Sequence, residues 1–334
     1  MKNKKILFFL PKTKWWPYYI YKELVNYLNK EYWYNIEIYN SNKDWLKIHF
    51  LNKFNVIFSV IPFLFNPFWL KKKYHIIVWN FEKEKLKNSI WNKLLYLTYK
   101  NIKSSKKTIL MNNYLLKEIP KLNNFKEKIE IIPNYINYKK FEEIQKYNIE
   151  RIEKLDNENI TNILTVTWFK FYDKAKWVLN LKNIINNYAR NHSDKQIIWN
   201  IAWNFDNDIF KKIKEQFDNI KTENNLKINW LWWINEEQLL EQYKINDIFL
   251  YWTYLDVFPT VLLEAGAAWL PMLVNNFESF YENIPEKLIC KSEEEMLNKL
   301  ENIDLKESQR INIENSKKYD IDKIAKQFIN LIEN

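Results

Sequence analysis

The sequence predicts an α/β protein made of two doubly wound halves, each with a parallel sheet between helices. Three observations support this fold class. Short apolar runs alternate with longer amphipathic segments along the chain, which is typical of βα units. The alternation stops over residues 137–159, a charged stretch without a strand candidate, and then restarts. The length of 334 residues is also about twice that of a usual single domain.

In the first half, strands are expected at the short apolar runs and helices at the amphipathic segments between them. The predicted strands are 5–10, 34–39, 55–60, 75–78, 107–111 and 129–132. The predicted helices are 18–28, 85–100 and 114–121. Together these elements form one doubly wound sheet.

The second half repeats the pattern after the charged stretch. Its predicted strands are 163–167, 196–202, 226–231, 247–251 and 271–274. Its predicted helices are 176–190, 206–217, 235–244 and 258–268, followed by a helical tail from 293. Two halves of this kind would bind a ligand in the cleft between them, at the carboxyl ends of their strands.

These elements predict domain boundaries. A first Rossmann-like domain is expected over 1–137, a linker over 138–160 and a second Rossmann-like domain over 161–315. A helical tail over 316–334 would then cross back to the first domain.

Composition excludes several classes of protein. Hydrophobic residues make up 47% of the chain and aromatic residues 17%, which is enough for a large core and argues against disorder. The single Cys290 cannot form an internal disulfide, and the apolar run 6–10 is too short for a secretory signal. The apolar stretch 56–70 is broken by Pro62 and Pro67, so no membrane span is expected. We therefore expect a cytoplasmic protein.

The charge is divided unevenly between the halves. Residues 1–150 contain 28 Lys and no Arg against 12 acidic residues, a net charge of +16, whereas 151–334 carry −6. A basic half of this kind indicates an anionic partner, such as a phosphate-bearing substrate or the anionic inner face of a membrane, which the protein would contact peripherally. A codon bias towards Lys is the alternative explanation.

The glycine and tryptophan contents are abnormal. The chain has 1 Gly and 16 Trp, whereas a protein of this length has on average roughly 23 Gly. Tight turns and phosphate-binding loops need glycine, because it alone adopts positive φ without strain. Either the fold avoids such positions, or tryptophan stands where glycine belongs.

The segment 256–265 carries the strongest local signal for chemistry. Seven residues separate two carboxylates, Asp256 in a loop and Glu264 within the predicted helix 258–268. The amides at the start of that helix, at Phe258, Pro259 and Thr260, would favour an anion. The segment thus offers an anion site beside a carboxylate that can bind hydroxyls. A solvated helix face is the alternative explanation for the carboxylate pair alone.

The order of motifs in the second half resembles that of retaining glycosyltransferases of the GT-B fold, family 4, which belong to the glycosyl transferases group 1. The resemblance covers most of the second half and depends on the order and spacing of its motifs. The matching strings are Val166-Thr167-Trp168-Phe169, Lys176-Trp177, Ile201-Ala202-Trp203-Asn204, Leu231-Trp232-Trp233-Ile234-Asn235-Glu236-Glu237 and the segment from Asp256 to Leu273.

The resemblance implies roles for individual residues. Lys176 would bind the donor diphosphate and stabilise the negative charge of the leaving group, although a solvated lysine at a helix start is the alternative. Glu264 would bind the ribose hydroxyls. Asp256, where the family has Glu, would act on the sugar near the reacting centre. The arginine of the family falls on Phe169, and the adjacent Lys170 would substitute for it.

Tryptophan occupies positions where the family has glycine. Trp168 and Trp269 are two of them, and Trp15 and Trp16 stand where the family has a glycine pair after its first strand. We hypothesise that UGA codons mean glycine in the source organism and were translated as tryptophan. The positions 15, 16 and 168 would then let bare backbone approach the donor. The alternative is that each tryptophan is genuine and packs in a core or stacks on a sugar.

The resemblance implies a glycosyltransferase of the hexosyltransferase type. It would move a sugar from a nucleotide-diphosphate donor to a hydroxyl of a glycan or lipid-linked acceptor, in cell-surface glycan or glycolipid synthesis. The donor is a substrate, and no cofactor is expected. No metal is expected either, because His49, His75 and His192 lack ligand-type spacing.

Two other functions remain open from the sequence. A nucleotide-sugar epimerase has the same fold and rearranges its donor without an acceptor. A basic nucleic-acid-binding protein would use the lysine-rich and aromatic surfaces instead. The transferase interpretation includes no nucleic-acid partner.

Overall fold

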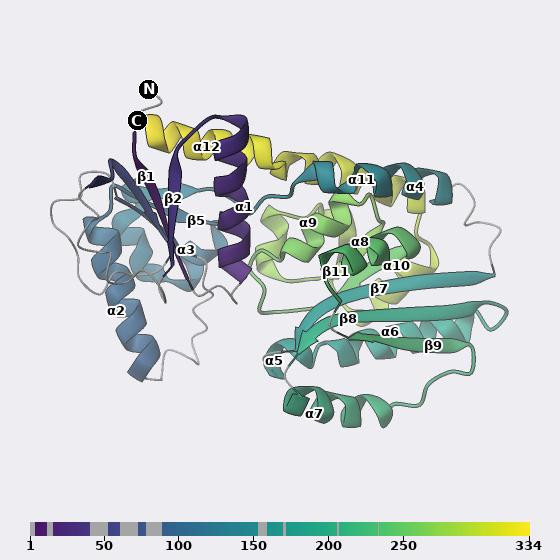
Figure 1. Cartoon of the computed structure of the whole chain (residues 1–334). Helices are drawn as coiled ribbons and strands as arrows, with labels where there is room; N and C mark the ends of the chain where they lie inside the picture. Colours follow the sequence, from purple (N-terminus) through teal and green to yellow (C-terminus); the bar gives the residue numbers. More distant parts are fainter. Residues whose placement is uncertain are drawn as a thin grey trace. The chain divides into compact units, whose positions relative to one another are not determined.

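The computed structural model describes residues 4–11, 16–40, 53–60, 73–77, 89–152, 159–169, 172–205, 207–232 and 234–334. The chain divides into two compact units (Figure 1). The first contains Met1–Asn134 and Ile321–Asn334, and the second contains Tyr135–Asp320. Within the described residues, each unit has a six-stranded parallel sheet flanked by helices, which confirms the predicted fold class.

The sheet of the first unit has the strand order β2-β1-β3-β4-β5-β6, and all of its pairs are parallel. Strands β1 and β3 are buried along their whole length and almost entirely apolar, because both faces of a parallel sheet are covered. The strands are β1 (Ile6–Leu10), β2 (Ile36–Asn40), β3 (Val56–Ser59), β4 (Lys73–Ile77), β5 (Lys107–Leu110) and β6 (Ile129–Ile131). The helices are α1 (Trp16–Glu31), α2 (Ser89–Ser104), α3 (Tyr114–Glu118), the 3₁₀ segment η3 (Pro120–Lys128) and α12 (Ile321–Glu333).

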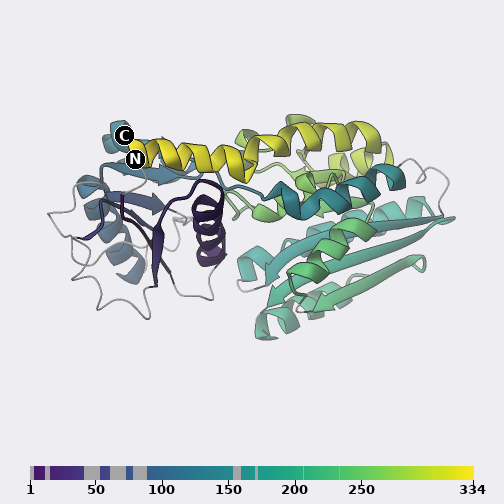
Figure 2. The same ribbon diagram turned by 45° about the horizontal axis from the view of Figure 1, so that its top comes forward.

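The last helix of the chain, α12, belongs to the first unit. Its Phe328 is buried against Phe8 of β1 and Phe58 of β3, with ring centroids 6.2 and 5.5 Å away. The Tyr32 hydroxyl donates to Asp322 at 2.6 Å, and the Tyr74 hydroxyl donates to the Leu331 carbonyl at 2.5 Å. The helix lies alongside α1 (Figure 1, Figure 2). The predicted tail 316–334 therefore consists of the end of the second unit followed by a core helix of the first.

The sheet of the second unit has the strand order β12-β11-β10-β7-β8-β9 and is also parallel. This is the order of a doubly wound dinucleotide-binding fold. The strands are β7 (Ile160–Phe169), β8 (Gln196–Phe205), β9 (Leu226–Trp232), β10 (Ile248–Tyr251), β11 (Met272–Asn275) and β12 (Ile289–Cys290). The two-residue β12 was not predicted.

Helices cover both faces of the second sheet. They are α4 (Glu142–Ile152), α5 (Tyr172–Ala175), α6 (Val178–Asn191), α7 (Asn207–Asp218), α8 (Glu236–Ile245), α9 (Thr260–Ala267), α10 (Glu293–Glu301) and α11 (Leu305–Ser316). Short 3₁₀ segments occur at η4 (Tyr138–Phe141), η6 (Glu278–Glu282), η7 (Glu286–Leu288) and η8 (Lys317–Tyr319). Trp199 of β8 lies fully buried in the core between this sheet and its helices.

The predicted linker 138–160 differs from the structure, because most of it is helical and belongs to the second unit. Helix α4 buries polar side chains as well as Ile144 and Ile152. Asn148 donates to the carbonyls of Tyr243 and Ala268, at 3.1 and 2.8 Å, and Gln145 donates to that of Ala267 at 2.7 Å. Both side chains are buried. A pattern of apolar residues cannot show a helix that is anchored in this way.

A buried ion pair ties α4 to the sheet. Arg151 Nε donates to Asp247 Oδ1 at 2.7 Å, just before β10. The other oxygen of Asp247 accepts from the backbone amide of Asn162 in β7 at 2.6 Å. Burial raises the pKa of the Asp247 carboxyl, and Arg151 opposes that shift. The pair therefore fixes α4, β7 and β10 together at one edge of the sheet.

We predict that Arg151→Met lowers the free energy of unfolding by about 3 kcal/mol at pH 7, because it leaves a buried carboxylate without its cation. The matched control Arg190→Met breaks the exposed pair with Glu223 and should cost about 0.5 kcal/mol. Urea-induced unfolding measures both. The loss in Arg151→Met should shrink as the pH falls and the buried carboxyl of Asp247 protonates. Equal losses in the two variants would contradict the prediction.

Candidate functional site

The candidate site lies where the strand order of the second sheet reverses. Strands β7 and β10 are neighbours, but the chain continues from β7 towards β8 and from β10 towards β11, on opposite sides. Ligands of such sheets bind outside the carboxyl ends of the strands at this point. The segment after β7 carries Lys176, and the segment after β10 carries Asp256. The topology thus brings the two predicted catalytic residues to one edge of the sheet.

Aromatic contacts join these two segments. The half-buried Lys176 follows α5, and its amide donates to the Tyr172 carbonyl at 2.8 Å. Its ammonium group lies 4.9 Å from the ring centroid of Trp177. That ring in turn meets Tyr254, from the segment after β10, edge to face at 4.7 Å. The segments that carry Lys176 and Asp256 are therefore in direct contact.

A buried asparagine holds the segment after β10. Asn275, at the end of β11, accepts from the Thr253 amide at 2.8 Å and donates to the Thr253 carbonyl at 2.9 Å. The Thr253 hydroxyl accepts from the Leu255 amide at 3.2 Å. These bonds fix the backbone immediately before Asp256 in the absence of any ligand.

Each predicted carboxylate accepts a hydrogen bond from a buried tyrosine. The Tyr251 hydroxyl, at the end of β10, donates to Asp256 Oδ2. The Tyr243 hydroxyl, from α8, donates to Glu264 Oε2 at 2.8 Å. Burial, together with the neighbouring carboxylate, raises the pKa of both phenols well above their usual value. Both phenols therefore stay protonated and act as donors.

The start of α9 presents backbone amides at the same edge. Pro259 precedes the helix and provides no side-chain cap for the amides of the first turn, which begins at Thr260. Such a helix start favours an anion. Phe258 points into the core, where its ring meets Tyr319 at 5.5 Å. Of the three predicted residues at the helix opening, Phe258 thus supports the turn, and Pro259 and Thr260 remain partly exposed.

Gly266, on the same helix, serves the packing of α9 against α11. A Cβ atom at this position would lie 2.9 Å from the Cβ of Ser316. The structure assigns this glycine to packing.

Several predicted site residues fall outside the described residues. Trp15 and Lys170 lie in undescribed segments. The backbone of Trp16 and Trp168 is described, at the start of α1 and near the end of β7, but their side chains are not. Their assignment to the donor site stays a prediction.

Among the described residues, no three His, Cys, Asp or Glu side chains lie close enough together to hold a metal ion. Within the same ranges, every helix is too short or too polar to cross a lipid bilayer.

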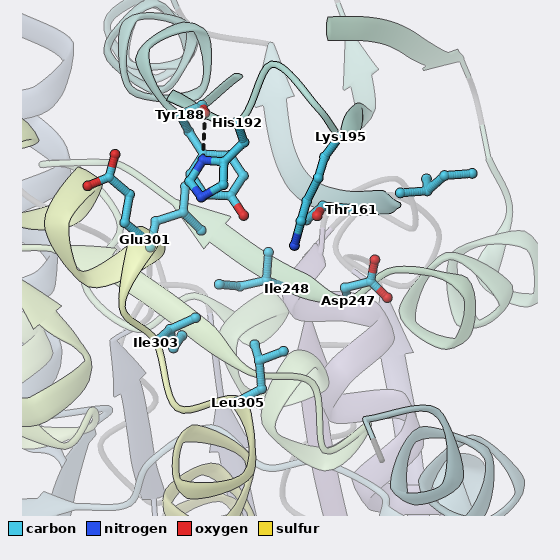
Figure 3. A pocket seen from close by; sticks show the side chains of 11 residues that line it. Thr161, Tyr188, His192, Lys195, Asp247, Ile248, Glu301, Ile303 and Leu305 are labelled. Carbon is cyan, nitrogen blue, oxygen red and sulfur yellow. Dashed lines mark hydrogen bonds between the residues drawn. The ribbon is translucent and has the colours of Figure 1, made fainter. Parts of the chain in front are cut away.

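A pocket of about 220 Å³ lies at the opposite edge of the second sheet, where β7 and β10 begin (Figure 3). Its Asp247 carboxylate is already paired with Arg151. The His192 ring bonds to the Tyr188 carbonyl at 2.9 Å. These polar groups thus serve the structure, away from the segments that carry Lys176 and Asp256.

Sequence reasoning missed three residues of the site. They are Tyr243, Tyr251 and Asn275, which lie at or near the ends of predicted elements. The pattern of apolar residues assigns the two tyrosines to the core. A hydroxyl on a buried ring close to a carboxylate was the available signal for Tyr251, which precedes Asp256 by five residues. For Tyr243 and Asn275, only the fold brings the partners together.

Residues 171–319, which lie in the second unit, match the sequence model of the family Glycosyl transferases group 1. No curated protein matches the chain.

Solved structures match the whole chain at low identity. The Anabaena protein HepE, in complex with UDP and glucose, has a TM-score of 0.68 and 11% identity over 99% of this chain and 100% of its own. A glycosyltransferase from Rickettsia africae has a TM-score of 0.65 and 17% identity over 99% and 100%. The trehalose-6-phosphate synthase OtsA has a TM-score of 0.59 and 17% identity over 84% of this chain and 72% of its own. These likenesses confirm the GT-B fold.

We predict that Gly266→Ala lowers the free energy of unfolding by about 1–3 kcal/mol, because the new methyl group overlaps Ser316. Combining it with Ser316→Gly should recover part of the loss, since that change removes the opposing Cβ. Urea unfolding of the two single variants and the double variant measures the coupling. A wild-type midpoint for Gly266→Ala would show that α9 and α11 do not meet this closely.

Proposed function

We propose that the chain transfers a sugar from a nucleotide-diphosphate donor to an acceptor hydroxyl, because residues 171–319 match the sequence model of glycosyl transferases group 1. The observation that carries this proposal is the convergence of groups at the edge between β7 and β10. Lys176, the start of α9 and the carboxylates of Asp256 and Glu264 lie on segments that meet there. Cationic groups and amides suit a diphosphate, and carboxylates suit the hydroxyls of ribose and sugar.

The proposed donor position follows from the chemistry of each group. Lys176 and the first amides of α9 bind the diphosphate, with Lys170 as a second cation. Glu264 binds the ribose hydroxyls, and Asp256 binds the sugar near the reacting carbon. UDP is the first nucleotide to test, because the similar HepE structure contains UDP and glucose.

The chemistry we propose is transfer with retention of anomeric configuration, as in family 4. The bond between the sugar and the diphosphate breaks and its electron pair leaves with the diphosphate. The acceptor oxygen bonds to the same carbon, and the proton of the acceptor hydroxyl passes to the departing diphosphate. Lys176 and the α9 amides stabilise the charge that grows on the departing diphosphate. Orientation of donor and acceptor supplies the rest, and no cofactor or protein-bound metal takes part.

The first unit is proposed to hold the acceptor. The net charge of +16 over residues 1–150 suits an acceptor with anionic groups, such as a lipid-linked glycan intermediate. It also suits peripheral contact with an anionic membrane from the cytoplasmic side. A role in cell-surface glycan or glycolipid synthesis is consistent with both.

We further propose that several tryptophans stand where the native protein has glycine, as UGA codons read as glycine would produce. Trp33 and Trp269 adopt positive φ, at 60° and 59°, which strains a residue with a Cβ. At the end of α9, the amides of Trp269 and Leu270 donate to the carbonyls of Gly266 and Ala265. That bonding pattern is a Schellman motif with Trp269 at its left-handed position, where helices favour glycine.

The indole groups support the same proposal. The ring N–H groups of Trp177, Trp252 and Trp269 are buried without an acceptor among the described residues. Buried tryptophans usually find one. Trp199 differs, since it is fully buried and its N–H donates to the Thr165 hydroxyl at 3.0 Å. Trp199 therefore fits a genuine tryptophan, and Trp269 fits a glycine.

We predict that Trp269→Gly raises the free energy of unfolding by about 1 kcal/mol, because it relieves the left-handed strain. The control Trp199→Gly should lower it by about 4 kcal/mol, because it opens a cavity in the core. Urea unfolding measures both changes, and the gene sequence is read in parallel. UGG codons at 33 and 269 would end the recoding proposal.

For the activity, we predict that a nucleotide-sugar from a panel raises the melting temperature of the chain by several degrees, as saturating ligands do. The panel is run on the chain itself and on a form with glycine at the fifteen tryptophan positions other than 199. Glu264→Gln should abolish the shift, because the amide keeps only one acceptor oxygen for both Tyr243 and the ribose hydroxyls. Glu241→Gln, on an exposed face of α8, is the control and should keep it. No shift with any donor in either form would contradict the proposed function.

A further inference from the structure

Each of the two carboxylates of the site accepts a hydrogen bond from a buried tyrosine. We propose that Tyr243 and Tyr251 are positioning residues, which fix the orientation of Glu264 and Asp256 before the donor arrives. The inference deepens the proposed function and rests on it. Neither tyrosine belongs to the motifs from which the site was predicted.

The direction of both hydrogen bonds is fixed by chemistry. An ionised carboxylate has no proton and can only accept. Burial raises the pKa of both phenols, so each keeps its proton and can only donate in these pairs. A hydrogen bond to a charged group is also stronger than one between neutral groups. Each tyrosine therefore holds one oxygen of its carboxylate.

Packing against neighbouring residues holds both tyrosine rings in place. Tyr243 lies fully buried in α8, which begins with a reciprocal capping box between Asn235 and Gln238. Phe249 of β10 packs between the two tyrosines, with ring centroids 6.1 Å from Tyr243 and 6.2 Å from Tyr251. Tyr251 also meets Phe280 at 6.4 Å. The row of packed aromatic rings thus fixes the positions of the two tyrosine hydroxyls.

The tyrosines act on different parts of the donor. Tyr243 fixes the plane of Glu264, and hence the direction in which this carboxylate accepts from the ribose hydroxyls. Tyr251 fixes Asp256, which belongs to the sugar end of the site. Loss of Tyr243 should therefore weaken binding of every ligand that has a ribose diol. Loss of Tyr251 should weaken only the contribution of the sugar.

Tyrosine-to-phenylalanine variants separate this role from packing, because they keep the ring and remove only the hydroxyl. Tyr188→Phe is a matched control, since Tyr188 is a buried tyrosine at the opposite edge of the same sheet. Each full-length variant is titrated calorimetrically with UDP, 2′,3′-dideoxyuridine diphosphate and UDP-glucose. Melting temperatures measured in parallel report any loss of folding.

For Tyr243→Phe, we expect affinity for UDP to fall about tenfold and affinity for the dideoxy analogue to stay unchanged. For Tyr251→Phe, affinity for UDP should stay unchanged, while the ratio of UDP-glucose to UDP affinity falls about tenfold. Tyr188→Phe should match wild type with all three ligands.

The outcomes separate the positioning role from the proposed function. Equal weakening of UDP and its dideoxy analogue in Tyr243→Phe would mean a general structural effect and overturn the proposal, as would wild-type affinities in both variants. If Tyr251→Phe keeps the wild-type ratio of UDP-glucose affinity to UDP affinity, the proposed positioning role of Tyr251 is overturned. If the unmodified chain binds no uridine ligand and no other nucleotide of the panel, the proposed function itself fails, and the positioning role fails with it.

Discussion

The pairing of β7 with β10 is the contact on which the rest of the second unit depends. At one end, Asp247 joins the two strands through the Asn162 amide, and the Asp247 amide returns a bond to the Asn162 carbonyl at 2.8 Å. Further along, the Thr165 hydroxyl of β7 donates to the Leu250 carbonyl of β10 at 3.0 Å. Polar groups inside a core cost energy unless they are paired, so these bonds specify one register. That register decides which segments meet at the carboxyl edge.

At this carboxyl edge, buried polar groups hold the residues of the candidate site in place. Asn275 fixes the backbone before Asp256, and tyrosines hold both carboxylates. Sites supported in this way lose little entropy when a ligand binds, because the side chains are already ordered. Within the described residues, the segments at this edge of the second unit are therefore held by buried hydrogen bonds.

Periodicity in the sequence predicted the strands and most helices, because strands of parallel sheets are nearly continuous apolar runs. It failed where polar side chains make the packing contacts, as in α4, whose buried Gln145 and Asn148 read as solvent-exposed. It also passed over β12, since two residues are too few for a pattern. The chemistry of the site was predictable as motif residues. The residues that support them were not predictable. Tyr243 bonds to Glu264 and Asn275 bonds to Thr253, and only the fold brings these residues together, because each pair is about twenty positions apart in the sequence.

The placement of α12 has a consequence for biosynthesis. Its Phe328 completes the aromatic core around Phe8 and Phe58, although it lies only six residues from the end of the chain. A ribosome therefore releases every residue of the second unit before it releases the helix that closes the first. The core of the unit that is synthesised first is therefore completed last, and part of its apolar surface stays exposed until α12 has left the ribosome.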